Sequence, residues 1–271
     1  MLIVDAHAHA GLNWFEPVES LVFQMDQNNV DKAVLIQHGG TYDNTYLLEC
    51  ARQYPKRFAV AAIVDTTLEN APTTLNHWVK AGVTAIRLGP MERTPGTDPL
   101  AIWRKASELG IAVSSLGKID EFSSDQFRKL VQSIPDLKIV IEHFAGAHSQ
   151  LNPPYTAYKA AMKLAQYPNT YIKIGGLGEI SARPPILRPE FRLDHTPPLI
   201  EMALESFGPT RVMWGSDFPP VSNREGYRNA LHGIMDHPAL ANNNDREWVI
   251  GKTAAGVFNI DPGSSTPIST A

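Results

Sequence analysis

The amino-acid sequence predicts an α/β protein that folds as a single-domain (β/α)8 TIM barrel. Eight short apolar runs alternate with segments of helical periodicity, which is the element count of this fold. The runs are apolar throughout, as is usual for parallel strands that are covered on both faces. The length of 271 residues fits one large barrel, although two small domains would need a similar length.

A doubly wound open sheet is the alternative arrangement of the same elements. Its nucleotide-binding versions carry a G-x-G-x-x-G fingerprint after the first strand or a G-x-x-x-x-G-K-[ST] phosphate loop. The first turn lacks the fingerprint, and the phosphate loop occurs nowhere in the chain. The barrel is therefore the preferred prediction.

Local signals place the elements along the chain. Pro55 stops one predicted helix, and Gly82 and Gly110 follow the ends of two others. The strands are expected at residues 3–9, 33–37, 58–64, 84–88, 111–115, 138–142, 170–174 and 211–214. The helices are expected at residues 17–29, 44–54, 70–81, 99–109, 124–133, 154–166, 198–207, 225–235 and 244–258.

The domain organisation is simple. We expect one barrel over residues 1–260, without internal repeats, and a disordered Ser/Thr/Pro-rich tail over 261–271. A long loop at 175–197 separates the seventh strand from its helix. Long loops inside compact domains are usually functional, so we expect this one to lie over the barrel mouth.

Composition excludes several classes of protein. The net charge of −4 gives no basic footprint for nucleic acid. The single cysteine, Cys50, excludes an internal disulfide and a thiolate zinc cluster, and its helical surroundings indicate a buried thiol. No signal peptide and no membrane-spanning run is evident, so the expectation is a soluble, cytoplasmic protein that acts on a small molecule. No pattern indicates an oligomeric state.

The first strand ends in two histidines spaced i, i+2. Side chains alternate along a strand, so His7 and His9 should point the same way, with Asp5 one layer beneath them. Paired imidazoles at a strand end form half of a metal site or half of a site that polarises a carbonyl. Two surface histidines could also fall at this spacing by chance.

Other polar side chains stand at or near the carboxyl ends of later strands, where barrel chemistry is found. Arg87 lies within a buried strand and needs an anionic partner, either a protein carboxylate or a substrate. His143 could be a hydrogen-bonded core histidine instead of a functional one. Asp217, just past the eighth strand, could merely cap the next turn.

Three motifs together resemble the amidohydrolase superfamily, in its amidohydrolase-2 branch. They are D-A-H-A-H at residues 5–9, E-H-F-A-G at 142–146 and W-G-S-D-F-P at 214–219. Further stretches are similar to the subgroup of TIM-barrel lactonases that act on sugar lactones and pyrone dicarboxylates. These stretches lie at residues 35–37, 44–48, 54–58, 87 and 173–177, and the resemblance covers residues 2 to 260.

The resemblance implies roles for four residues. Asp217 would take a proton from the hydrolytic water. One divalent ion, zinc or manganese, would be held by His7, His9, His143 and Asp217. One departure matters, because Ser114 and Ser115 end the fifth strand where a binuclear site would have lysine or histidine. That leaves a mononuclear site or none, and some lactonases of this subgroup work without metal.

The leading hypothesis is a hydrolase that opens the lactone of a sugar acid or of an anionic aromatic catabolite. Asp217 would be the general base, and His143 and the histidine pair would stabilise the oxyanion, directly or through the metal. Substrate contacts are expected from four residues at or after the carboxyl ends of the first, second and fourth strands, namely Trp14, Gln37, His38 and Arg87.

Two other functions fit the same residues. A zinc-dependent decarboxylase of an aromatic or unsaturated acid would use the same histidines and aspartate, and it would release CO2. A catalytically inactive barrel that serves as a binding or scaffold protein is the third reading, which the number of polar strand ends disfavours.

Overall fold

The computed structural model describes residues 1–188, 190–191, 193 and 195–263, so positions 264–271 of the expected tail lie outside the described residues. Eight strands are present, one in each of the expected runs. They are β1 (Val4–Ala8), β2 (Lys32–Ile36), β3 (Phe58–Ala62), β4 (Ala85–Leu88), β5 (Ala112–Ser115), β6 (Ile139–Ile141), β7 (Thr170–Ile174) and β8 (Val212–Trp214).

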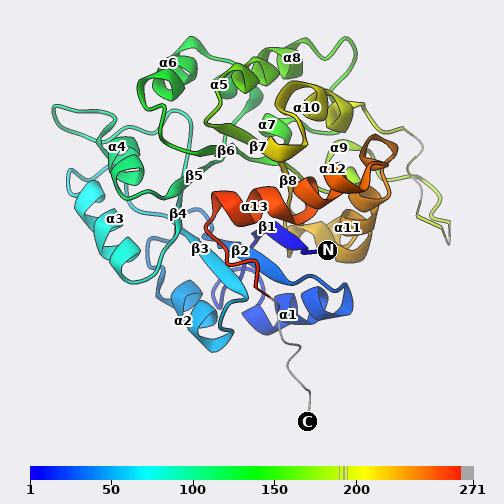
Figure 1. The fold of residues 1–271 in the computed structure, drawn as a ribbon, viewed down its shortest axis with the longest axis horizontal. Coiled ribbons are helices and arrows are strands. Elements are labelled where there is room, and N and C mark those ends of the chain that lie inside the picture. The colour runs from blue at the N-terminus through cyan, green and yellow to red at the C-terminus, as the bar shows by residue number, and fades with distance from the viewer. Residues whose placement is uncertain (189, 192, 194, 264–271) are drawn as a thin grey trace.

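Helices connect the strands and lie outside them (Figure 1). The longer ones are α1 (Val18–Gln27), α2 (Thr45–Gln53), α3 (Ala71–Lys80), α4 (Ala101–Glu108), α6 (Asp125–Ser133), α8 (Thr156–Met162), α10 (Leu199–Phe207) and α11 (Tyr227–Met235). The shorter ones are α5 (Ile119–Phe122), α7 (His143–Gly146), α9 (Leu177–Ile180), α12 (Asn243–Glu247) and α13 (Thr253–Val257). Further helical turns are η1 (Lys163–Gln166), η2 (Pro209–Arg211), η3 (Pro220–Asn223), η4 (Pro238–Leu240) and η5 (Trp248–Lys252).

The strands form one parallel sheet in the order β1 to β8, which confirms the predicted barrel. The seam between β8 and β1 is closed just beyond the end of β8. There the backbone N–H of Asp217 donates to the His7 carbonyl at 2.8 Å, and that of His9 donates to the Phe218 carbonyl at 2.8 Å. The same two hydrogen bonds therefore close the barrel and place Asp217 beside the paired histidines.

Apolar side chains of mixed size line the inside of the barrel, with alanines on β3, β4 and β5 and with Val34, Ile36, Val140 and Met213 on other strands. Ala59, Ala61, Ala85 and Ala112 belong to the inner apolar cluster, into which Phe258 projects from the end of α13. Larger apolar side chains on the opposite faces of the strands pack against the helices.

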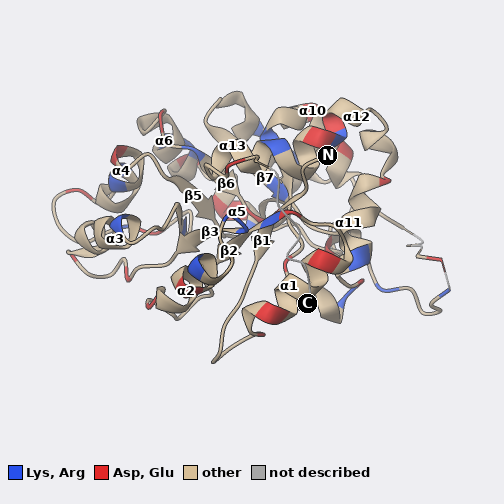
Figure 2. Cartoon of the chain, turned by 60° about the horizontal axis from the view of Figure 1, so that its bottom comes forward, with Lys and Arg blue, Asp and Glu red and all other residues tan. Residues whose placement is uncertain are grey.

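Three short helices interrupt segments that the sequence predicts as loops or strand ends: α5, α7 and α9. The expected final helix over residues 244–258 is instead a succession of α12, η5 and α13. Among the described residues, no helix combines the length and the hydropathy needed to cross a membrane. Acidic and basic segments are interspersed over the helices (Figure 2).

Asp5 does not lie beneath His7 and His9, so that expectation is wrong. The β1–β2 register shifts between Asp5 and Ala8, which inserts one extra residue into β1. Before this bulge Val4 and Ala6 face the barrel interior, so Asp5 faces outward. After the bulge the parity is reversed, and His7 and His9 face inward.

The Asp5 carboxylate is completely buried and joins β1 to the segment after β8. It accepts hydrogen bonds from the Ser216 backbone at 2.8 Å, the Ser216 hydroxyl at 2.6 Å and the Tyr227 hydroxyl at 2.9 Å. Burial raises the pKa of Asp5 to about 6, and these hydrogen bonds limit the rise. The folded state therefore holds this proton to a higher pH than the unfolded chain does. As pH rises from 3.8 to about 6, the ionisation of Asp5 lowers the free energy of unfolding.

Replacing Tyr227 by Phe should lower the free energy of unfolding by about 1.5–3 kcal/mol at pH 8, because a donor to an ionised, buried acceptor is lost. Tyr158→Phe is the matched control, since that buried hydroxyl donates to the neutral Leu199 carbonyl, and about 0.5–1.5 kcal/mol is expected. Urea unfolding at pH 8 and pH 5 measures both. The two losses in free energy of unfolding should become more similar at pH 5, where Asp5 is protonated. Equal losses in the two variants at pH 8 would contradict this role of the Tyr227 hydroxyl.

Candidate active site

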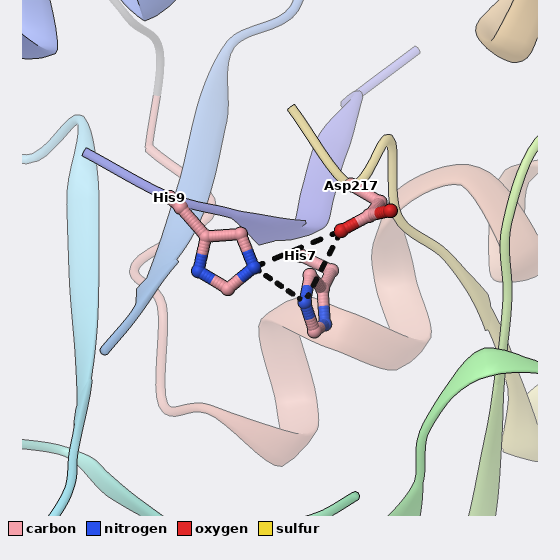
Figure 3. A group of neighbouring side chains, drawn as sticks. All are labelled: His7, His9 and Asp217. Atoms are coloured by element: carbon pink, nitrogen blue, oxygen red, sulfur yellow. Dashed lines mark hydrogen bonds and ion pairs between the residues drawn. The ribbon is translucent and has the colours of Figure 1, made fainter. Parts of the chain in front are cut away.

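Two histidines from β1 and its end meet the aspartate that follows β8 (Figure 3). The His7 Nε2 and His9 Nε2 atoms are 3.1 Å apart, and Asp217 Oδ1 lies 3.9 Å from the first and 3.7 Å from the second. Asp217 has a φ of 59°, in the left-handed region that non-glycine residues rarely adopt. This conformation turns its carboxylate toward the imidazoles, and such strain is common at functional sites.

A buried carboxylate, Glu142, lies deeper in the barrel at the end of β6. Its Oε2 accepts from Arg87 Nε at 3.1 Å and from Arg87 Nη2 at 2.8 Å, while its Oε1 accepts from the Ser114 hydroxyl at 2.6 Å. Burial alone would raise the pKa of Glu142, but Arg87, Lys173 and the other neighbours hold it well below its usual range. Arg87 therefore has a protein carboxylate as its partner.

Lys173 connects this carboxylate to the histidines. Its Nζ lies 3.0 Å from both His7 Nδ1 and the Ser114 hydroxyl, and 3.6 Å from Glu142 Oε1. Burial lowers the pKa of Lys173 to about 8. The ammonium form donates to His7 Nδ1, which places the proton of the neutral imidazole on Nε2. Burial and the Lys173 charge keep the pKa of His7 well below its usual value, so His7 is a neutral donor.

His9 has the opposite arrangement of donor and acceptor atoms. Its Nδ1 lies 2.7 Å from the carbonyl oxygen of Ile36 and must donate to it. The lone pair of Nε2 therefore faces His7 and Asp217. Burial lowers the pKa of His9, which favours this neutral form.

His143 is the first residue of α7, and its ring lies against that of His7 with 4.6 Å between the ring centres. Its Nδ1 is 2.9 Å from Glu179 Oε1, on α9. Burial opposes the charged form of His143, yet Glu179, Glu142 and Asp217 together raise its pKa. His143 is thus the histidine best suited to be a cationic donor.

Asp217 also has a partner that the sequence analysis did not identify. Arg224 Nη1 donates to Asp217 Oδ2 at 3.0 Å, which leaves Oδ1 directed at His7 and His9. Burial alone would raise the pKa of Asp217, but the positive charges of His143 and Arg224 hold it below its ordinary value. The carboxylate is therefore ionised near neutral pH and available as a base.

A cavity of about 470 Å³ is bordered by His9 and Asp217, and its walls also include Trp14, His38 and Arg87. Three of the four expected substrate contacts thus come together around the aspartate. Gln37 does not line this cavity, because its side chain donates to the Asp43 carbonyl and accepts from the backbone of His38. Phe15 stacks on His9, with 4.9 Å between the ring centres.

No catalytic or binding role was predicted from the sequence for five polar residues that contact the expected site: Ser114, Glu142, Lys173, Glu179 and Arg224. Lys173 stands within a buried strand, so the argument that singled out Arg87 applies to it equally. Glu142 precedes His143 at the end of a buried strand, so it too is a charged residue that needs a partner. Glu179 and Arg224 lie in connecting segments, where charged residues are common and a single sequence offers no signal.

The spacing of His7 Nε2, His9 Nε2 and Asp217 Oδ1 fits a divalent ion. Ligand atoms about 2.0–2.2 Å from a tetrahedral zinc lie roughly 3.3–3.6 Å apart, close to the 3.1–3.9 Å observed. His9 donates its second ring N–H to the Ile36 carbonyl, as is typical of a histidine that binds a metal ion. The Nδ1 of His7 instead faces the Lys173 ammonium group. His143 falls in a second candidate group, with His7 and Glu142.

Comparison with known proteins supports the resemblance inferred from the motifs. The family model described as Amidohydrolase matches residues 4–260. An L-fucono-1,5-lactonase of Burkholderia ambifaria is 34% identical over 94 residues, which cover 34% of this chain and 30% of the relative. A 4-sulfomuconolactone hydrolase of Hydrogenophaga intermedia is 25% identical over 214 residues, covering 75% of this chain and 65% of the relative. The matches therefore span less than two thirds of either relative.

The fold is shared with solved structures. A probable 2-pyrone-4,6-dicarboxylic acid hydrolase from Acinetobacter baumannii, with citric acid bound, superposes with a TM-score of 0.74 at 18% identity. The match covers 96% of this chain and 100% of the other. At this identity the likeness shows the fold alone.

Replacing Arg87 by Met should lower the free energy of unfolding by about 3–5 kcal/mol, because it leaves the buried Glu142 without its main partner. Arg104→Met is the control, since the Arg104–Asp98 pair is half exposed and contributes about 1 kcal/mol or less. Chemical denaturation at neutral pH measures both. An Arg87 variant as stable as the control would show that this arginine is not required for the fold and would favour a role in substrate binding alone.

Proposed function

The chain belongs to the amidohydrolase family, and we propose that it hydrolyses a lactone to the open-chain hydroxy acid. The observation that carries this proposal is the ionised Asp217 carboxylate at the edge of a cavity, with His7 and His9 within 4 Å of its Oδ1. Support for the substrate class comes from two curated relatives whose names specify lactone hydrolysis.

Asp217 would act as the general base. With Oδ2 bound by Arg224, Oδ1 is free to accept a proton from a water in the cavity. The water oxygen then forms a bond to the ring carbonyl carbon, and the carbonyl oxygen becomes an oxyanion. The cationic His143 would donate to this oxyanion, which stabilises the transition state more than the ground state.

Ring opening completes the reaction. The tetrahedral intermediate re-forms the carbonyl and breaks its bond to the ring oxygen, which leaves as an alkoxide. The proton held by Asp217 can pass to this oxygen and restore the base. The product is a hydroxy acid, which releases one proton to solvent at neutral pH.

The same atoms could hold one divalent ion, zinc or manganese, at His7, His9 and Asp217, which would require the His7 proton on Nδ1 and Lys173 as the neutral amine that accepts it. Such an ion supplies Lewis-acid polarisation of the carbonyl when it is bound. With or without this ion, Asp217 would transfer the proton. Trp14, His38 and Arg87 would contact the substrate in both cases.

Asp217→Asn should reduce kcat by at least about 10²–10⁴-fold, because a positioned base is lost while the side chain keeps its size. Turnover is followed by proton release over a panel of sugar lactones and carboxylated lactones, with Asp236→Asn, an exposed aspartate, as the control. Undiminished turnover in the Asp217→Asn variant would remove Asp217 as the base. Release of CO2 from a carboxylic acid substrate would instead favour a decarboxylase.

Zinc or manganese titrated into chelator-treated protein should bind at about one ion per chain, with weaker binding in His9→Asn because a ligand lone pair is lost. Calorimetry measures this directly, without activity. His148→Asn is the control, since His148 is exposed and belongs to neither candidate ligand group. Equal affinity in the wild-type protein and the His9 variant would contradict the assigned ligand set.

A further inference from the structure

The backbone that carries His143 is strained. His143, Phe144 and Ala145 have φ values of 51°, 49° and 57°, and Gly146 follows at 75°, so α7 is a left-handed turn. This conformation costs roughly 1–2 kcal/mol for each non-glycine residue. Phe144 and Ala145 are completely buried, and their packing must offset this cost. The consequence of the turn is that His143 projects into the barrel beside His7.

Glu179 fixes the other end of the His143 ring. A carboxylate can only accept, so the 2.9 Å contact with Glu179 Oε1 requires a proton on His143 Nδ1. With Nδ1 used in this way, Nε2 is the atom left for the site, and it lies 3.9 Å from Glu142 Oε2. Without Glu179, the ring would be free to rotate or to change tautomer.

The chain makes room for this carboxylate at a glycine. A Cβ on Gly175 would lie 1.7 Å from Glu179 Oε2, so any other residue there would displace the Glu179 side chain. Glu179 is also nine-tenths buried, and its Oε2 has no hydrogen-bond partner among the described residues. A buried carboxylate with one oxygen that accepts no hydrogen bond lowers the stability of the fold. The hydrogen bond of Glu179 to His143 is therefore the feature that would account for a glutamate at this position.

We infer that Glu179 is the positioning residue of His143: it holds the Nδ1–H so that Nε2 faces the reacting carbonyl. The inference rests on the proposed function for its effect on rate, although the hydrogen bond itself can be tested separately. It assigns a role to the start of the long segment after β7, which the sequence analysis expected to lie over the barrel mouth.

The kinetic test compares three variants on the best lactone of the panel. Glu179→Ala should lower kcat by about 10- to 100-fold with little change in KM, because orientation of a reacting group is lost while the substrate pocket is kept. Glu179→Gln should recover much of this rate, since its amide oxygen can still accept from Nδ1–H. Glu190→Gln, an exposed residue of the same segment, should match the wild-type protein. Wild-type kcat in Glu179→Ala, or no recovery in Glu179→Gln, would overturn the inference.

A spectroscopic test needs no substrate and so separates this inference from the proposed function. The metal-free wild-type protein should show a low-field, slowly exchanging ring N–H proton that is absent in His143→Asn. The same proton should persist in Glu179→Gln and disappear in Glu179→Ala and in Gly175→Ala. Its persistence in Glu179→Ala would overturn the inference, even for a protein that hydrolyses no lactone.

A double-mutant cycle links the glycine to the carboxylate. If Gly175→Ala acts by displacing Glu179, the double variant should be no more impaired than Glu179→Ala alone. If the losses in kcat of the two single variants add fully in the double variant, the Gly175→Ala substitution does not act by displacing Glu179.

Discussion

The buried charge of Glu142 is the constraint on which the rest of the site depends. A carboxylate inside an apolar barrel is tolerated only when its charge is compensated and its oxygens accept hydrogen bonds. Arg87, Lys173 and Ser114 meet this requirement from three strands of the barrel. Lys173 then contacts His7 and sets its donor role, so the chemistry of the first histidine follows from the compensation of Glu142.

The remaining groups are held by the connections after the strands. His143 is bound by Glu179 from the segment after β7, and Asp217 by Arg224 from the segment after β8. In each case an opposite charge favours the ionised form of the group that would transfer or donate a proton. The barrel supplies a rigid frame, and its loops determine the protonation states, which is how one fold supports different reactions.

The sequence predicted the strands well, because eight apolar runs bounded by Gly, Pro and polar residues leave few alternative pairings. It failed at Asp5, where a bulge reverses the side-chain alternation on which the prediction relied. It also predicted that Gln37 contacts the substrate, whereas the polar groups of that side chain bind the backbone of its own loop and Gln37 is not among the residues that line the cavity. Both differences arise from local backbone geometry that residue types alone do not specify.

The sequence by itself determined the fold class, the family and the set of histidine, arginine and aspartate residues at the strand ends. These depend on periodicity and on short motifs, which are local properties of the chain. Only the tertiary structure decided which partner each of these groups has, because Glu142, Lys173, Glu179 and Arg224 lie far from their partners in the sequence or in segments without periodicity. Since pKa values and tautomers depend on those partners, the chemical role of each histidine is a property of the folded barrel.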